Sequence, residues 1–233
     1  MSAGPLAGRP MDRRERFVRP LLIAFLVACA VDLGGVLTDS GIAHLVAKPL
    51  LMPLLAAYAA ARRGPRLLIA ALLCGWVGDV FLLADSDTAF LIGMGGFAAG
   101  HLCYLRLFGR ARGALLPGIL YAAVLAVFLV LLWGSLPAGL RIPLAGYSLL
   151  LTAMAYRSGV LGRYAAAGGA LFLLSDALIA TGIADWPQLP APDFWVMLTY
   201  VAAQFLLTLG ALAPGAKGAG GVIGAYRERS ISI

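Results

Sequence analysis

Long apolar runs, each close to the length that crosses a bilayer, follow one another along almost the whole chain. About 20 apolar residues in a helix span the hydrocarbon core, and the 233 residues hold eight such runs separated by short connections. Only 12% of the residues are charged and 61% are hydrophobic, whereas soluble domains carry about 25% charged residues. These values exclude an ordinary soluble enzyme and a disordered protein. The sequence therefore predicts an all-α, polytopic membrane bundle of eight transmembrane helices.

We expect three parts along the chain: a basic segment over 1–19, the eight-helix domain over 20–213, and a tail over 214–233. The predicted spans are 20–37, 42–61, 67–84, 89–107, 115–133, 140–156, 164–183 and 194–213.

The basic residues alternate between connections. Arginines gather before the first span and after the second, fourth and sixth, whereas the intervening connections are rich in aspartate and hold only Arg141. Cytoplasmic loops carry the excess of Lys and Arg, so both termini are predicted to be cytoplasmic. The net charge of +7 is spread over several loops, which argues against a nucleic-acid partner. The excess of arginine over lysine is typical of a GC-rich bacterial genome and favours the bacterial inner membrane.

The three cysteines, Cys29, Cys74 and Cys103, lie inside apolar runs and form no CxxC pair. Neither a disulfide framework nor a zinc site is indicated, and we expect no cofactor and no metal. One alternative stays open, because Asp79, Asp176 and His101 together would supply three metal ligands.

Five acidic, basic or histidine side chains lie more than one turn inside the predicted spans, where a charge is costly and marks function by default: Asp32, Lys48, Asp79, His101 and Asp176. At about 1.5 Å per residue, the three aspartates lie at one height above the cytoplasmic ends of their spans. Lys48 falls within a turn or two of that height, as do Tyr147 and Tyr200. We therefore expect one polar layer in the outer half of the bundle.

Several of these residues allow a second interpretation. Lys48 could extend to the outer surface, although Pro49 beside it frees a backbone carbonyl and favours a built site. His101 is as compatible with packing as with catalysis, and Asp32, followed by Gly34 and Gly35, favours a structural role. Tyr200 and Gln204, one turn apart, fit either helix–helix hydrogen bonding or a pocket wall.

A short internal echo links two pairs of spans. Gly75-Trp-Val-Gly-Asp79 is matched by Phe172-Leu-Leu-Ser-Asp176, and Phe97-Ala-Ala-Gly-His101 by Tyr200-Val-Ala-Ala-Gln204. The matching spans run in the same direction, so the repeat would be parallel.

Five elements of the sequence, in this order, resemble the YhhN family of lysoplasmalogenases: Lys48-Pro49, Gly78-Asp79, Phe97-x-x-x-His101-x-x-Tyr104, Ser175-Asp176 and Tyr200-x-x-x-Gln204. The resemblance covers about residues 42–212. Asp32 has no counterpart in the family pattern.

The resemblance implies hydrolysis of the vinyl ether bond of a lysoplasmalogen, or of a related ether lysolipid, to a fatty aldehyde and a glycerophospho-base. That reaction needs a proton donor and a carboxylate, and two neighbouring buried carboxyl groups can share one proton. We therefore expect Asp79 and Asp176 to be catalytic, with their acid and base roles unassigned. Substrate binding is expected of the remaining polar residues: Lys48, His101, Tyr104, Tyr147, Ser175, Tyr200 and Gln204.

Two other functions fit intramembrane aspartates and a lysine. An ion-coupled transporter uses such groups as a relay, and a lipid-binding membrane protein would hold lipid without turnover. The sequence specifies neither the lipid headgroup and chain length nor the oligomeric state.

Overall fold

The computed structural model describes residues 15–110 and 114–213, and within these ranges the chain forms helices and connecting turns but no strand. The α-helices are α1 (Glu15–Leu37), α2 (Gly41–Ala61), α3 (Arg66–Phe81), α4 (Asp87–Phe108), α5 (Leu115–Leu132), α6 (Ala138–Ser158), α7 (Arg163–Ile183) and α8 (Pro192–Leu212). A 3-10 turn, η1 (Gly159–Leu161), links α6 to α7. The predicted all-α, eight-helix fold is confirmed, while the cytoplasmic location of the termini stays a prediction.

Seven of the described helices are long and apolar enough to cross a membrane, and α3 is the exception. It has 16 residues and ends at Phe81, three residues before the predicted span ends, so it is about 24 Å long. Two turn hydrogen bonds continue the chain beyond it, from Leu82 N–H to the Gly78 carbonyl (3.0 Å) and from Ala84 N–H to the Phe81 carbonyl (3.1 Å). Helix α3 therefore crosses the bundle together with the turn that follows it.

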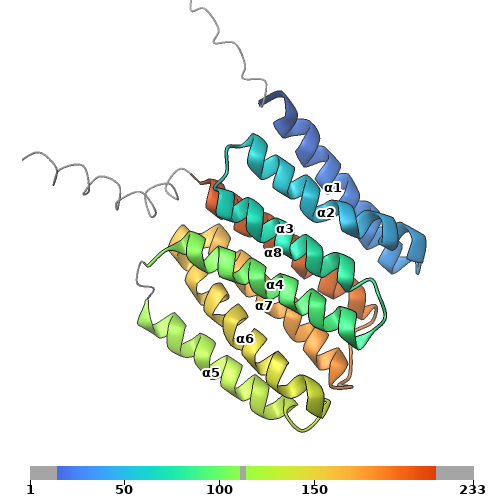
Figure 1. Ribbon diagram of the computed structural model, residues 1–233, viewed down its shortest axis with the longest axis vertical. Coiled ribbons are helices and arrows are strands. Elements are labelled where there is room, and N and C mark those ends of the chain that lie inside the picture. The colour runs from blue at the N-terminus through green and yellow to red at the C-terminus, as the bar shows by residue number, and fades with distance from the viewer. Residues whose placement is uncertain (1–14, 111–113, 214–233) are drawn as a thin grey trace, which may run out of the picture.

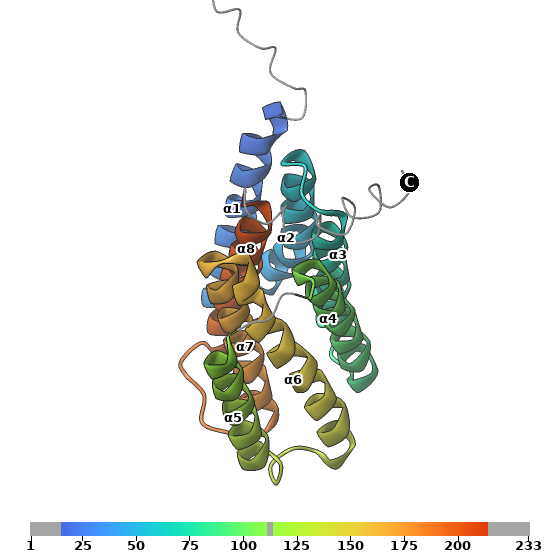
Figure 2. The ribbon, with the colours of Figure 1, turned by 90° about the vertical axis from the view of Figure 1, so that its left-hand side faces the viewer.

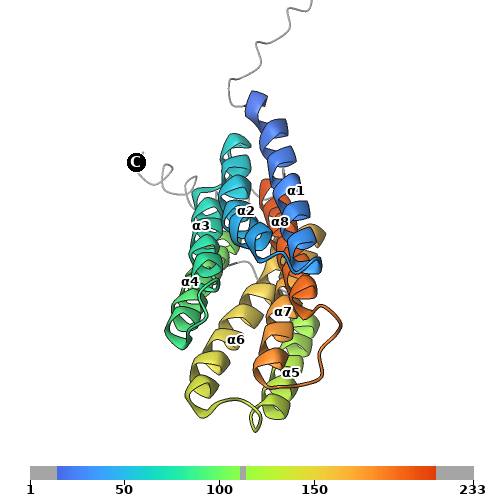
Figure 3. The same ribbon diagram turned by 90° about the vertical axis from the view of Figure 1, so that its right-hand side faces the viewer.

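The helices lie in two rough layers (Figure 1). Helices α1 and α2 occupy one edge, α3 lies over α8 and α4 over α7, and α6 and α5 form the opposite edge. Helix α5 buries only Leu132 and exposes leucines and valines along the rest of its length, as expected of a lipid-facing helix. Figures 2 and 3 show α6 leaning away from α5 and α7 toward the end that carries the α5–α6 connection.

Small residues set the closest helix contacts. A Cβ atom on Gly96 of α4 would lie 2.9 Å from the Gly78 nitrogen of α3, and one on Gly168 of α7 would lie 2.8 Å from the Ala203 oxygen of α8. Membrane helices associate through such close backbone approach. The α3–α4 and α7–α8 hairpins thereby bring Asp79 and Asp176 into the centre of the bundle.

Candidate functional site

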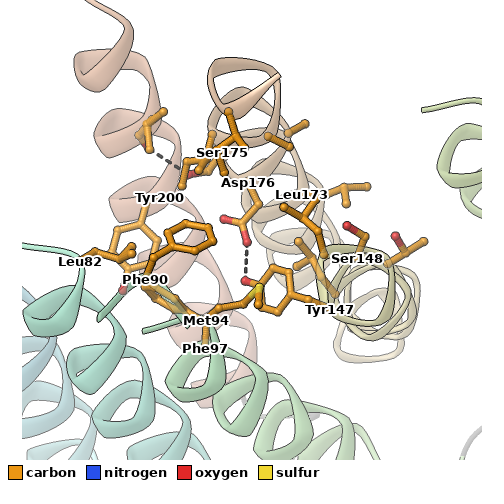
Figure 4. A pocket seen from close by; sticks show the side chains of 18 of the residues that line it. Leu82, Phe90, Met94, Phe97, Tyr147, Ser148, Leu173, Ser175, Asp176 and Tyr200 are labelled. Atoms are coloured by element: carbon orange, nitrogen blue, oxygen red, sulfur yellow. Dashed lines mark hydrogen bonds between the residues drawn. The ribbon is translucent and has the colours of Figure 1, made fainter. Parts of the chain in front are cut away.

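A cavity of ≈ 150 Å³ lies inside the bundle, and six of the nine predicted site residues line it. They come from five helices: Lys48 from α2, Asp79 from α3, Tyr147 from α6, Ser175 and Asp176 from α7, and Tyr200 from α8. The rest of the wall is mostly apolar and includes Phe90, Met94 and Phe97 of α4 (Figure 4). The depth comparison thus predicted correctly that both aspartates and Lys48 meet at one cavity, while their roles stay predictions.

Each aspartate is held by one tyrosine. The Tyr200 hydroxyl donates to Asp79 Oδ2 at 2.7 Å, and the Tyr147 hydroxyl donates to Asp176 Oδ2. Asp79 is buried, whereas Asp176 is partly exposed toward the cavity, where it faces Tyr147 (Figure 4). The partners lie on different helices, so each hydrogen bond also fixes a helix pair.

A second polar group stands behind each tyrosine. Because the Tyr147 hydroxyl donates to Asp176, it accepts from His101 Nε2, which lies 3.1 Å away. On the other side, Gln204 Nε2 donates to the Tyr200 hydroxyl at 3.4 Å, and Gln204 Oε1 accepts from Tyr104 at 2.7 Å.

His101, Tyr104 and Gln204 are buried and do not line the cavity. The structure therefore places these three predicted substrate-binding residues one layer behind it, where they orient the tyrosines. Gln204 makes a helix–helix hydrogen bond, whereas Tyr200 makes one as well and also forms part of the pocket wall.

An aromatic cluster separates the two hydrogen-bonded chains. The Phe172 ring packs edge-on against Tyr200, Phe97 and His101, with ring centroids 5.5, 6.2 and 4.8 Å apart. Phe172 was not among the site residues predicted from the sequence. Its signal was its place one helical turn before Asp176, which puts both side chains on one face of α7.

The backbone carbonyl expected to be free beside Lys48 is used for a contact between helices. The Pro49 carbonyl lacks a helical partner because Pro53 has no N–H group, and Trp76 Nε1 of α3 donates to it at 2.9 Å. Helix α2 is thus fixed to α3 next to Lys48. His44, whose Nδ1 lies 2.9 Å from Asp32 Oδ1, was not among the residues predicted from the sequence. Its signal was its position one turn before Lys48.

Asp79, Asp176 and His101 do not gather as metal ligands. Within the ranges that the structure describes, no group of three or more His, Cys, Asp or Glu side chains has a metal-binding arrangement. His101 Nε2 is directed at Tyr147 instead.

The fold and the cavity define a class: multi-pass, all-helical membrane proteins with two aspartates at a mostly apolar internal cavity. The chain belongs to the YhhN family, whose profile matches residues 43–211, and this confirms the resemblance carried by the five sequence elements. It is 37% identical to Lysoplasmalogenase TMEM86B of Rattus norvegicus over 226 residues, which cover 93% of this chain and 94% of that protein.

A bacterial relative is more distant. The chain is 31% identical to Lysoplasmalogenase of Mycobacterium tuberculosis (strain CDC 1551 / Oshkosh) over 203 residues, 79% of this chain and 76% of that protein. No solved structure matches the chain. The family match begins within α2, so α1 and Asp32 lie outside it.

Proposed function

We propose that this protein is a lysoplasmalogenase of the bacterial inner membrane, which hydrolyses the vinyl ether bond of a lysophospholipid by acid–base catalysis. The observation that carries the proposal is the pair of aspartates, each accepting a hydrogen bond from a tyrosine, at one mostly apolar cavity. An apolar wall suits a fatty chain, and the carboxyl groups suit the ether at the end of that chain. The names of the relatives support the same reaction class.

The chemistry uses two carboxyl groups that share one proton. The neutral acid protonates the alkene carbon next to the ether carbon. This leaves an oxocarbenium ion beside the second carboxyl group, which was ionised from the start and is a carboxylate. Water adds to this cation while that carboxylate takes a proton, giving a hemiacetal. The newly protonated group then donates to the departing glycerol oxygen, and the first carboxylate takes the hemiacetal hydroxyl proton. Aldehyde and glycerophospho-base leave, one water has been consumed, and both groups return to their initial state.

We assign the acid to Asp176 and the carboxylate to Asp79. Lys48 lies next to Pro49, whose carbonyl accepts from Trp76 of α3, one turn before Asp79, and an opposite charge nearby favours an ionised partner. Asp176 is directed into the cavity, where a bound alkene carbon would be within its reach. In this assignment Lys48 acts on Asp79 and does not need to contact the lipid phosphate.

Replacing either aspartate tests the proposal. Asp79→Asn and Asp176→Asn preserve shape but cannot exchange a proton, so aldehyde release from a vinyl ether lysolipid in detergent should fall about 10²- to 10⁴-fold. Asp185→Asn, at an exposed connection, is the matched control and should retain full activity. Near-normal release by either monodisperse site variant would exclude the two-aspartate mechanism.

Two further measurements separate the proposal from its alternatives. A lysolipid with a saturated ether lacks the alkene carbon that accepts the proton, so the wild type should not cleave it. A transporter would instead require both aspartates for flux across sealed vesicles and would release no aldehyde in micelles. Absence of cleavage by the wild type with every vinyl ether lysolipid tested would overturn the proposed function.

A further inference from the structure

A buried carboxylate on α1, Asp32, lies outside the family match and does not line the cavity. Asp32 is 0% exposed, and its Oδ1 lies 2.9 Å from Nδ1 of His44, which is 26% exposed. Its second oxygen, Oδ2, is buried and has no hydrogen-bond partner within the described ranges. A buried carboxylate without full compensation is costly, so this arrangement calls for a further positive partner.

Lys48 is the candidate for that partner by position and charge. It follows His44 by one helical turn, so both side chains lie on the same face of α2. His44 contacts Asp32, and the Pro49 carbonyl next to Lys48 accepts from Trp76, which lies one turn before Asp79 on α3. Lys48 therefore lies between the two carboxyl groups along α2. Lys48 also lines the cavity, yet it has neither a hydrogen bond nor an ion pair with any residue that the structure describes. Its position therefore depends on the balance between two carboxylates.

The close contact between α1 and α2 brings Asp32 and His44 together. A Cβ atom on Gly35 would lie 2.8 Å from the Ala43 Cβ and 3.0 Å from the His44 nitrogen. Only a glycine at this position lets the first turn of α2 approach α1 so closely. Asp32, one turn earlier on α1, then reaches His44.

We propose that Asp32, held by His44, is a positioning residue that draws the Lys48 ammonium partly away from Asp79. This inference rests on the proposed function and deepens it, since it adds α1 to the site. With Asp32 neutralised, Asp79 would be the remaining nearby anion, and the ammonium would close on it. A carboxylate engaged in a direct ion pair is a weaker base, so the proton transfer from water would slow.

The test is a double-mutant cycle between Asp32→Asn and Lys48→Met. We expect Asp32→Asn to lower kcat about tenfold with little change in KM, and to have no further effect in the Lys48→Met background, because interacting residues are non-additive. Asp39→Asn, at an exposed position with φ of 54° that asparagine adopts readily, is the matched control and should leave kcat unchanged. Equal losses from Asp32→Asn in both backgrounds would show a merely structural role and overturn the proposal.

The same cycle on the midpoint of thermal unfolding needs no activity. Coupled residues give a non-additive change in the midpoint, and additive changes would again refute the proposal. The two proposals can therefore fail separately. A wild type that releases no aldehyde would contradict the proposed function, whereas the midpoints alone would still test the coupling between Asp32 and Lys48.

Two substitutions at His44 complete the test. The amide nitrogen of His44→Asn takes the place of Nδ1 and should preserve kcat, whereas His44→Ala should reproduce the loss caused by Asp32→Asn. Similar losses in both His44 variants would contradict the role given to the Nδ1–H donor.

Discussion

The orientation of each aspartate depends on a single phenolic hydroxyl. Tyr200 and Tyr147 donate to Asp79 and Asp176 from other helices, and each receives a hydrogen bond from a buried side chain behind it. Hydrogen bonds in such networks support one another inside a low-dielectric interior. The geometry of the proposed catalytic pair therefore rests on residues that need not touch the substrate.

Removing either hydroxyl should reduce activity while the helices stay packed. We expect Tyr200→Phe and Tyr147→Phe each to lower kcat about tenfold, because the lost bond is worth about 1–3 kcal/mol to a buried partner. Tyr156→Phe, which loses an exposed bond to the Ala114 carbonyl, is the control and should have full activity. Wild-type kcat in both site variants would mean that the tyrosines do not orient the carboxyl groups.

The sequence predicted which polar residues meet and not how they pair. Counting residues along a span gives the height of Asp79 or Asp176, and this was enough to bring them to one cavity. It does not give the rotation of a helix that is apolar on every side, so the pairing of Asp79 with Tyr200 could not be predicted. Asp32 was assigned to structure for the same reason, since its contact with His44 depends on how closely α1 approaches α2.

At the scale of elements, the α3–α4 hairpin depends on glycines that face each other. A methyl group on Gly96 would lie 2.9 Å from the Gly78 nitrogen and 3.0 Å from the Cys74 oxygen. These are backbone atoms, which cannot turn aside as a side chain can. The neighbouring Gly95 has nothing within 4 Å of such a methyl group.

This pair of adjacent glycines gives a matched test of helix packing. Gly96→Ala should destabilise the protein by about 1–3 kcal/mol through overpacking and lower aldehyde release by shifting Asp79. Gly95→Ala should be neutral or slightly stabilising, because alanine is the better helix former by about 1 kcal/mol. Thermal unfolding in detergent measures both effects, and equal midpoints for the two variants would contradict the close contact.

Within the whole molecule, two hairpins, α3–α4 and α7–α8, resemble each other and each supplies one aspartate. A Cβ on Gly93 would meet the Gly78 oxygen at 3.2 Å in the α3–α4 hairpin. At the matching place in the α7–α8 hairpin, Ser175 Oγ donates to the Val196 carbonyl at 3.0 Å. Residues that match in the short sequence echo are thus neighbours in both hairpins, and the two aspartates line one cavity.

The depth predicted for the two aspartates determines the side of the membrane from which substrate arrives. If both termini are cytoplasmic, the cavity lies in the outer half of the bilayer, and lysolipid of the outer leaflet reaches it directly. Reporters fused at Arg63 and at Arg112, which lies outside the described residues, should then be cytoplasmic, and one at Asp185 should be external. The arginine clusters predict this orientation, because positive residues are retained on the cytoplasmic side. An external signal at Arg63 together with a cytoplasmic one at Asp185 would invert the molecule and place the two aspartates in the inner half.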